Sequence, residues 1–336
     1  MFTRKADFIS AWPYSQESFV VGSYGYIVNT AGTYRYDPAN NAWTTLTSHP
    51  RADLWYSIGF ATASYGYTAC GMLIPSYSST DEVYRYDPIA DSWTQMDDFP
   101  GGARYSHTAF VIDNIPYVGT GVSSYFDPSP EKYRDLWRYN EGADTWTQMA
   151  DMPISADKRD TAYGFSIGGY GYISAGMSDS DECLDDTWRY DPSTDSWTQV
   201  DDFPVKTSRY NATVPSVLEG KCYCLSAYNG FSIVYVFDPI TGWSSAGDGY
   251  PGPGEYGESL TIESRLFIGL GSWPYNYWWE YEPGVVPEGA IAGDHKHGLY
   301  NAEDYGTARE AATAQSINDN IVAGHTYSES GGGDID

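Results

Sequence analysis

The sequence is poor in the residues that build disulfide scaffolds, histidine metal centres and membrane spans. Its 336 residues include five histidines and four cysteines, and the cysteines lack zinc-finger spacing. We therefore expect Cys70, Cys183, Cys222 and Cys224 to be small buried side chains. No apolar run approaches the roughly 18 residues that a transmembrane helix needs. The sequence thus predicts neither a cross-linked miniprotein nor a membrane-spanning chain.

Basic residues are also scarce. Lys and Arg number 18 against 45 Asp and Glu, which gives a net charge of −27. A surface this acidic repels nucleic-acid phosphate and anionic membranes, and it attracts cations or a basic partner. We therefore expect no nucleic-acid partner and no membrane insertion. The opening residues MFTRKADFIS contain no apolar run typical of a secretory signal, so we expect synthesis in the cytoplasm without signal-peptide secretion.

Aromatic residues and glycines, by contrast, are plentiful. Aromatics make up 17% of the chain, and 35 glycines are spread along most of it. This composition favours many short strands joined by tight turns. Five similar segments recur, and each ends at a tryptophan: Trp43, Trp93, Trp146, Trp197 and Trp243. The intervals between these tryptophans are 50, 53, 51 and 46 residues.

Each repeat predicts an outer hairpin. An aromatic strand ends in an acidic or amide residue five or six positions before the tryptophan, at Asp37, Asp87, Asn140, Asp191 and Asp238. Its side chain can accept local backbone N–H groups, and the proline that usually follows presets φ for a turn. Upstream, an aromatic residue begins another strand and a glycine often follows four residues later, as in Tyr67 and Gly71. Four strands per repeat predict a β-propeller.

The number of blades follows from the two ends of the repeat region. The third strand of the repeat occurs a sixth time as WEYEPG, which ends near Glu282, but no tryptophan follows it at the expected distance. At the other end, FTRKADF aligns with WTQMDDF, because Phe8 precedes Phe19 by eleven residues just as Phe99 precedes Phe110. Phe2 then takes the place of the missing tryptophan. We expect six blades, with the N-terminal strand closing the ring and removing exposed sheet edges.

The recurring Tyr-Asp-Pro and Trp pattern resembles the kelch family over roughly residues 1–283. The expected fold is all-β: a six-bladed kelch-type β-propeller with four antiparallel strands per blade, followed by a non-propeller tail at 284–336. The family's paired glycines are mostly reduced to one here, so the chain resembles a divergent member. The resemblance implies either a recognition module or a carbohydrate-active enzyme of the sialate-mutarotase or galactose-oxidase kind.

The loops that join second to third strands carry candidate binding residues. Aromatic side chains in blades 3 and 6 form a candidate ligand or partner surface that can stack on sugar rings or peptide aromatics: Tyr125, Phe126, Tyr133, Trp273, Tyr275 and Tyr277. The other interpretation is that they pack the loops against the disc. The sequence alone leaves both open.

Three arginines recur shortly after a proline, at the entry to a first strand: Arg104, Arg159 and Arg209. They match the kelch arginine, which has a structural role. The alternative is a ring of cations that captures a ligand carboxylate, as the resemblance to sialate mutarotases implies. Pro13 and Leu54 interrupt the series in blades 1 and 2.

Metal sites have two candidates. Asp179, Asp181 and Asp185 alternate in a blade 4 loop, as carboxylates that converge on calcium do, although a solvated acidic loop is the alternative. His295 and His297 resemble the His-x-His segments of phage tail-fibre tips and form a candidate His-bound metal site. A galactose-oxidase-like copper site has no counterpart, since His49 and His107 stand isolated in the repeats.

The tail has few large apolar residues, and the helical spacing of Ala308, Ala311, Ala312 and Gln315 indicates a short helix over 307–318. Such a segment cannot fold alone, so we expect it to dock on another subunit, with His295, His297 and Tyr300 near that interface. No catalytic constellation is apparent in the repeats. We therefore predict a non-enzymatic recognition or structural module of a larger assembly, such as a phage tail or capsid decoration, facing a glycan or host-surface ligand.

Overall fold

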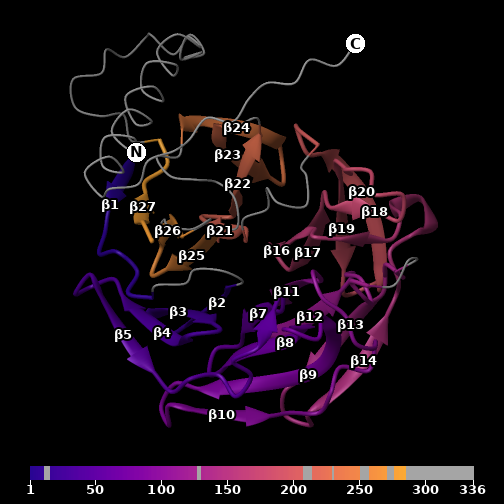
Figure 1. Cartoon of the computed structure of the whole chain (residues 1–336). Coiled ribbons are helices and arrows are strands. Elements are labelled where there is room, and N and C mark those ends of the chain that lie inside the picture. The colour runs from indigo at the N-terminus through magenta and orange to yellow at the C-terminus, as the bar shows by residue number, and fades with distance from the viewer. Residues whose placement is uncertain are drawn as a thin grey trace, which may run out of the picture. The chain divides into compact units, whose positions relative to one another are not determined.

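The computed structural model describes residues 1–10, 16–126, 130–206, 214–228, 231–249, 257–270 and 276–284. Within the unit Met1–Val286, these residues form six four-stranded antiparallel blades arranged in a ring (Figure 1). The expected all-β propeller is therefore confirmed. The described residues contain no α-helix and only one 3-10 turn, η1 (Ile154–Ala156). The expected tail lies almost entirely outside the described residues.

The first three blades follow one another along the chain. Blade 1 comprises β2 (Glu17–Val21), β3 (Tyr24–Asn29), β4 (Gly32–Asp37) and β5 (Ala42–Leu46). Blade 2 comprises β7 (Ile58–Ala61), β8 (Gly66–Leu73), β9 (Ser78–Asp87) and β10 (Ser92–Gln95), and β6 (Leu54–Trp55) also pairs with β8. Blade 3 comprises β11 (Thr108–Ile112), β12 (Ile115–Gly119), β13 (Leu136–Asn140) and β14 (Thr145–Met149).

The last three blades complete the ring. Blade 4 comprises β16 (Tyr163–Ile167), β17 (Tyr170–Ser174), β19 (Asp186–Asp191) and β20 (Ser196–Asp202), and beside it β15 (Arg159–Asp160) pairs with β18 (Met177–Ser178). Blade 5 comprises β21 (Ser216–Leu218), β22 (Lys221–Tyr228), β23 (Phe231–Asp238) and β24 (Gly242–Gly249). Blade 6 comprises β25 (Glu258–Ile262), β26 (Arg265–Gly269), β27 (Trp278–Tyr281) and β1 (Phe2–Arg4).

The N-terminal strand closes the ring, as the sequence predicts. Strand β1 pairs antiparallel with β27, and Phe2 lies opposite Tyr281. In the other blades the repeat tryptophan lies opposite the corresponding aromatic of the third strand, as Trp43 does opposite Tyr36. The Phe2 and Tyr281 ring centroids are 4.6 Å apart, against 4.9 Å for Trp43 and Tyr36. Phe2 therefore occupies the tryptophan position of blade 6.

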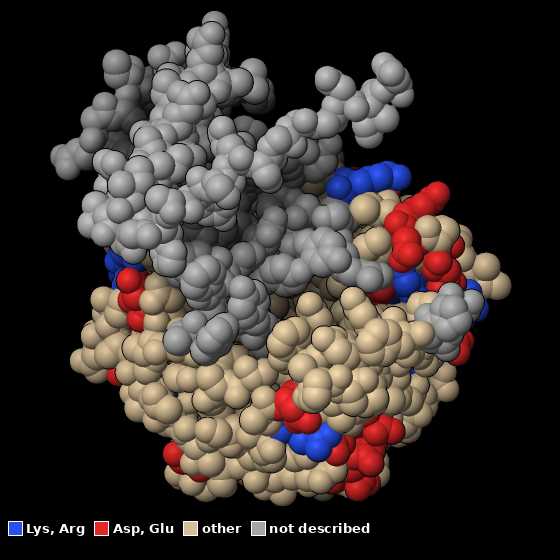
Figure 2. Space-filling view, in the orientation of Figure 1, with Lys and Arg blue, Asp and Glu red and all other residues tan. Residues whose placement is uncertain are grey.

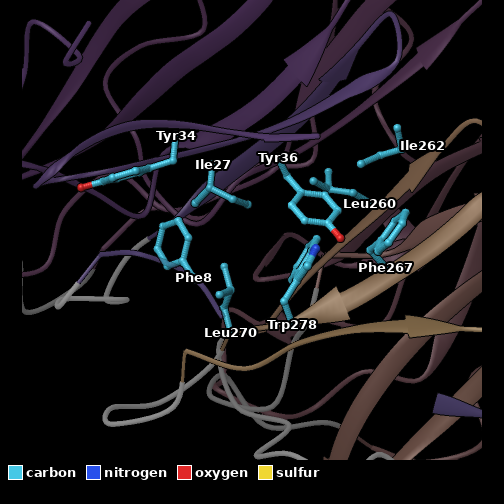
Figure 3. Close-up of a cluster of buried hydrophobic side chains, with 9 residues drawn as sticks. All are labelled: Phe8, Ile27, Tyr34, Tyr36, Leu260, Ile262, Phe267, Leu270 and Trp278. Carbon is cyan, nitrogen blue, oxygen red and sulfur yellow. The ribbon is translucent and has the colours of Figure 1, made fainter. Parts of the chain in front are cut away.

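Apolar side chains fill the spaces between blades. Figure 3 shows the junction of blades 6 and 1, where the rings of Tyr36, Phe267 and Trp278 lie together around Leu260. Phe8 closes the same cluster and is 5.0 Å from Tyr34, measured between ring centroids. Because each large ring pairs with residues of two blades, the core is divided among the junctions rather than gathered at one centre.

The turn before each tryptophan links its blade to the preceding one. In blades 1 to 4, the residue two positions before the tryptophan is an Asn or Asp with a positive φ: Asn41, Asp91, Asp144 and Asp195. Its side chain accepts a hydrogen bond from the hydroxyl of the third-strand tyrosine. The same side chains accept a backbone N–H from the outer strand region of the preceding blade, as Asp91 does from Thr47 at 2.9 Å. We call this contact the turn clip.

The turn clip predicts a specific cost at Asp91. Asp91→Ala leaves the Thr47 amide without its acceptor and keeps a strained positive φ, so we expect a loss of about 2–3 kcal/mol in the free energy of unfolding. Asp91→Asn is the matched control, because Asn41 holds the same place in blade 1. We expect it to cost less than about 1 kcal/mol. Urea denaturation measures both, and equal losses in the two variants would contradict the clip.

Candidate functional site

The inner edges of the blades surround a central cavity of about 290 Å³. The first strands of neighbouring blades contact one another all the way round, from β2 through β7, β11, β16 and β21 to β25 and back. The residues that begin these strands, together with the loops before them, line the cavity. It is lined by residues of all six blades, which are far apart in the sequence.

Four tyrosines form much of the cavity wall: Tyr56, Tyr105, Tyr125 and Tyr163. Tyr105 and Tyr163 are buried, and the ring centroids of Tyr56 and Tyr105 are 6.2 Å apart. No lysine or arginine is among the described residues that line the cavity. The walls are therefore largely aromatic, and the polar side chains among these described lining residues are hydroxyls, the Glu258 carboxyl, the His107 imidazole and the Gln16 amide.

Two buried carboxyl groups lie at adjacent strand starts. Glu258 begins β25 and lines the cavity, and its Oε2 accepts a 2.5 Å hydrogen bond from the Ser18 hydroxyl. Glu17 begins β2, and its Oε1 accepts the backbone N–H of the cavity-lining Ser57 at 3.1 Å. Burial raises the pKa of Glu17 to about 8, against the opposing effect of the Ser57 hydrogen bonds. Burial, and then the charge of Glu17, raise the pKa of Glu258 well above its ordinary value.

His107 faces the same cavity from the loop before β11. It is 5% exposed, and neither ring nitrogen makes a hydrogen bond to a described residue. The Ala69 carbonyl lies near the ring, but no ring nitrogen reaches it with hydrogen-bond geometry. Burial, and then the charge of Arg104, lower the pKa of His107 to about 3, so the imidazole is neutral at physiological pH. An unpaired buried imidazole is costly, and such groups are often found where a ligand binds.

The carboxyl of Glu17 predicts a pH dependence of stability. Its pKa in the folded state lies above the ordinary 4.5, so the folded protein binds this proton more tightly than the unfolded chain. Its contribution to stability is complete below pH 4.5 and is lost as the pH rises to 8, by up to about 5 kcal/mol. We expect Glu17→Gln to match the wild type at pH 5 and to exceed it at pH 8.5.

The pH effect is measured by urea denaturation across that range. Glu263→Gln is the control, because Glu263 is an exposed residue in the turn after β25. Parallel stability curves for the wild type and Glu17→Gln would contradict the buried, protonated carboxyl.

Three aromatic side chains gather beside the cavity, and we call them the aromatic cluster. The ring centroids of Tyr77 lie 5.6 Å from Tyr125 and 5.1 Å from Phe126, which are themselves 5.3 Å apart. Tyr125 is 54% exposed and Phe126 is 67% exposed. Tyr125 also lines the cavity, so the two features adjoin. The sequence predicts Tyr125 and Phe126, whereas it does not single out Tyr77.

The other predicted aromatic residues lie elsewhere. The Tyr133 ring covers the Arg104 guanidinium, whose carbon is 3.8 Å from the ring centroid. Tyr277 covers Arg4 at the same distance, on the outer side of blade 6. Trp273 and Tyr275 lie outside the described residues. The described members of the predicted surface therefore fall into separate contacts, of which only the pair in blade 3 adjoins the cavity.

The predicted arginines are buried in ion pairs. Arg104 binds Asp135 through two hydrogen bonds of 2.7 and 2.9 Å, and Arg159 binds Asp186 at 2.7 and 2.8 Å. Both guanidinium groups are fully buried, so they are not presented to a ligand on the surface. Each joins the loop between two blades to a third strand, which matches the structural interpretation. Arg209 lies outside the described residues.

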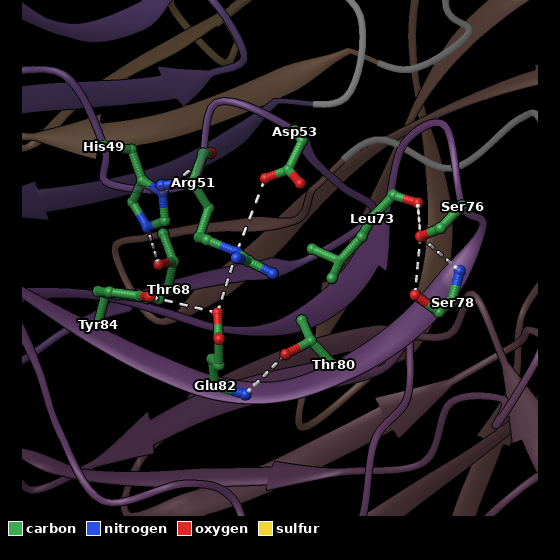
Figure 4. Close-up of polar contacts among 10 residues, drawn as sticks. All are labelled: His49, Arg51, Asp53, Thr68, Leu73, Ser76, Ser78, Thr80, Glu82 and Tyr84. Atoms are coloured by element: carbon green, nitrogen blue, oxygen red, sulfur yellow. Dashed lines mark hydrogen bonds and ion pairs between the residues drawn. The ribbon is translucent and has the colours of Figure 1, made fainter.

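Blade 2 uses a different residue for the same pairing. Leu54 stands at the arginine position, but Arg51 pairs with Glu82 at 3.1 Å, and Glu82 corresponds in the repeat to Asp135 and Asp186. Figure 4 shows this pair beside His49, whose ring nitrogens hydrogen bond with Thr68 and Arg51. His49 is thus a structural residue of blade 2.

The predicted calcium ligands do not converge. The described residues contain no group of three His, Cys, Asp or Glu side chains placed to hold a metal ion. Asp181 instead pairs at 3.1 Å with the ammonium of Lys132, which also lies 3.3 Å from the buried Asp160 and donates to the Ser178 carbonyl. A lysine therefore supplies the cation at this loop. The predicted tail residues His295, His297 and Tyr300 lie outside the described residues.

On the face of the molecule that Figure 2 shows, most of the described surface carries no charged side chain. Figure 2 shows acidic and basic side chains in small separate groups around a broad surface that carries neither. No helix in the described part of the chain is long and apolar enough to cross a membrane.

Comparison with known proteins agrees with the repeat and the ring. Residues 166–204 match the Kelch motif family. Kelch-like protein 15 of Danio rerio is 33% identical over 132 residues, and that of Gallus gallus is 37% identical over 132 residues. These matches cover 38% of this chain but only 21% and 26% of those proteins. The chain therefore spans about a quarter or less of the length of these curated relatives.

A solved structure shows the same architecture. The structure titled "Structure of YjhT" superposes with a TM-score of 0.69 at 13% identity, over 81% of this chain and 94% of that one. At this identity the likeness concerns the fold alone. Taken with the motif match and the six blades, it makes this chain a divergent kelch-repeat β-propeller.

Proposed function

We propose that this propeller is a non-enzymatic recognition module that binds a partner protein with the central cavity and the aromatic cluster. A kelch propeller suits protein interaction in general. The observation that carries the proposal is the exposure of Tyr125 and Phe126 at the rim of the cavity. Apolar rings left in water beside a concave site are typical of surfaces that bind partners.

The cluster has the properties of an interface anchor. Tyr125 stacks on Tyr77 and meets Phe126 edge-on, so the three rings support one another before any partner binds. A preordered aromatic surface loses little conformational entropy on binding, and aromatic residues commonly dominate interface energies. The adjoining cavity offers a pocket into which a partner side chain can be buried.

The proposal predicts where selected peptides bind. A random peptide library displayed on phage and selected on the wild-type propeller is expected to yield peptides that lose at least about tenfold affinity for the double variant Tyr125→Ser, Phe126→Ser. Ile89→Ser with Ile240→Ser is the matched control, because both isoleucines are over 90% exposed in outer turns. Biolayer interferometry compares the affinities of the wild type and the two double variants. Peptides that depend on the isoleucines instead would contradict the proposal.

A carbohydrate-active enzyme is the second candidate. Its support is that the buried carboxyl of Glu258 and a neutral His107 both line this cavity, since general acid–base catalysis uses groups with shifted pKa values. We expect sialic-acid mutarotation and, after copper loading, alcohol oxidation to be absent. Turnover above the uncatalysed rate that disappears in Glu258→Gln would establish the enzyme instead.

We further propose that the module works in a larger assembly, such as a phage tail or capsid decoration, attached through residues 284–336. The support is the sequence of that segment, which is poor in large apolar residues and carries the His295 and His297 pair. A chain that ends at Pro283 is expected to remain a folded monomer and to lose its assembly partners in analytical ultracentrifugation. Unchanged assembly of that shorter chain would contradict this attachment.

A further inference from the structure

We propose that the central cavity, which Glu258 and His107 both line, receives a positively charged side chain, a lysine or arginine of the partner protein, with its head group against Glu258. This inference rests on the proposed function, because it names the ligand chemistry of the same site. Three properties of the cavity lead to it: the kinds of polar group it presents, the aromatic walls and the size.

The polar groups at the cavity need hydrogen-bond donors. One oxygen of Glu258 accepts a hydrogen bond from the Ser18 hydroxyl, and a carboxylate can accept several more hydrogen bonds. His107 has neither nitrogen paired, and a neutral imidazole always has one nitrogen that accepts. Ammonium and guanidinium groups carry several donors and no acceptor. A cationic head group would therefore supply donors of the kind that these acceptors lack.

The walls suit the rest of such a side chain. Lysine and arginine stems are apolar and pack along aromatic surfaces, while cations are attracted to the faces of tyrosine rings. The propeller already uses this contact, since Arg104 lies over Tyr133 and Arg4 over Tyr277, each at 3.8 Å. The described lining holds no basic residue to compete, and the net charge of −27 attracts a basic partner.

The size favours one side chain over a larger ligand. Pockets that enclose small molecules usually measure roughly 300–1,000 Å³, and this cavity is about 290 Å³. An oligosaccharide would fill more than this volume. A lysine or arginine that enters from a peptide lying on the aromatic cluster needs only the cavity itself.

Such a ligand would change the protonation of the carboxyls. Among the described residues, the titratable groups that face the cavity or lie directly behind it are those of Glu258 on β25, Glu17 on β2, His107 before β11 and the tyrosines of the wall. The pKa of Glu17 is raised to about 8, so this carboxyl is largely protonated at neutral pH, and burial raises the pKa of Glu258 in the same direction. A cation favours the ionised form, so binding would release a proton. Affinity for the cation would then rise with pH.

The test uses acetylated glycine pentapeptides with a central lysine, arginine, norleucine or glutamate. Isothermal titration of the full chain at pH 7, in buffers of different ionisation enthalpy, gives both the affinity and the protons released. We expect the lysine or arginine peptide to bind at least about tenfold more tightly than norleucine and to release about one proton. Glu258→Gln is expected to remove both effects, whereas Glu263→Gln keeps them.

Other outcomes have distinct meanings. Equal affinity for the norleucine peptide, tighter binding of the glutamate peptide, or binding of the lysine peptide without proton release would overturn the inference with the wild type alone. If peptides selected for the propeller depend on Tyr125 and Phe126 but not on Glu258, the inference of a cationic ligand is wrong, whereas partner binding at the aromatic cluster is supported. If they depend on neither, the proposed function fails as well.

Discussion

The structure depends on the way in which each blade is tied to the one before it. The Asn or Asp of the turn clip accepts a backbone amide of the neighbouring blade and a tyrosine hydroxyl of its own blade. The tryptophan that follows adds a second tie, as the Trp43 indole donates to the Ala6 carbonyl at 3.1 Å. The clip ties blades 1 to 4 to the blade before each of them, the Trp243 amide of blade 5 donates instead to Asp201 of blade 4, and β1 completes the last blade. Because the first strands are then held in contact, their opening residues are brought together around one cavity.

Much of the fold could be predicted from the sequence because the repeat exposes it. The tryptophan spacing predicts the outer hairpins, and the eleven-residue interval from Phe8 to Phe19 predicts the closing strand. The turn clip was missed, although Asn41 and its equivalents stand at a fixed distance from each tryptophan. Its signal is a positive φ, which a sequence pattern shows only indirectly. The pairing of Arg51 with Glu82 was missed because that arginine stands three residues before the expected position.

The cavity could not be predicted in the same way. Glu17, His107 and Glu258 belong to blades 1, 3 and 6, and each looks like an ordinary polar residue at or just before a strand start. Their chemistry comes from burial and proximity, which the ring creates after the chain has closed. Tyr77 was missed for a similar reason, since it meets Tyr125 from another blade. By contrast, Arg104 and Arg159 could be found from the sequence, because each follows a proline at the same place in the repeat. Each forms the same kind of ion pair in its blade.

The account joins the ring of blades, an aromatic rim and a cavity whose described lining holds a carboxyl but no basic residue into one binding face. Its central claim is the position of a partner's basic side chain, and a crystal structure of the propeller with the lysine peptide bound tests that claim most directly. The account predicts the ammonium within hydrogen-bond distance of Glu258, with the peptide backbone against Tyr125 and Phe126. A peptide seated on the outer strands, or a lysine pointing to solvent above an empty cavity, would contradict it.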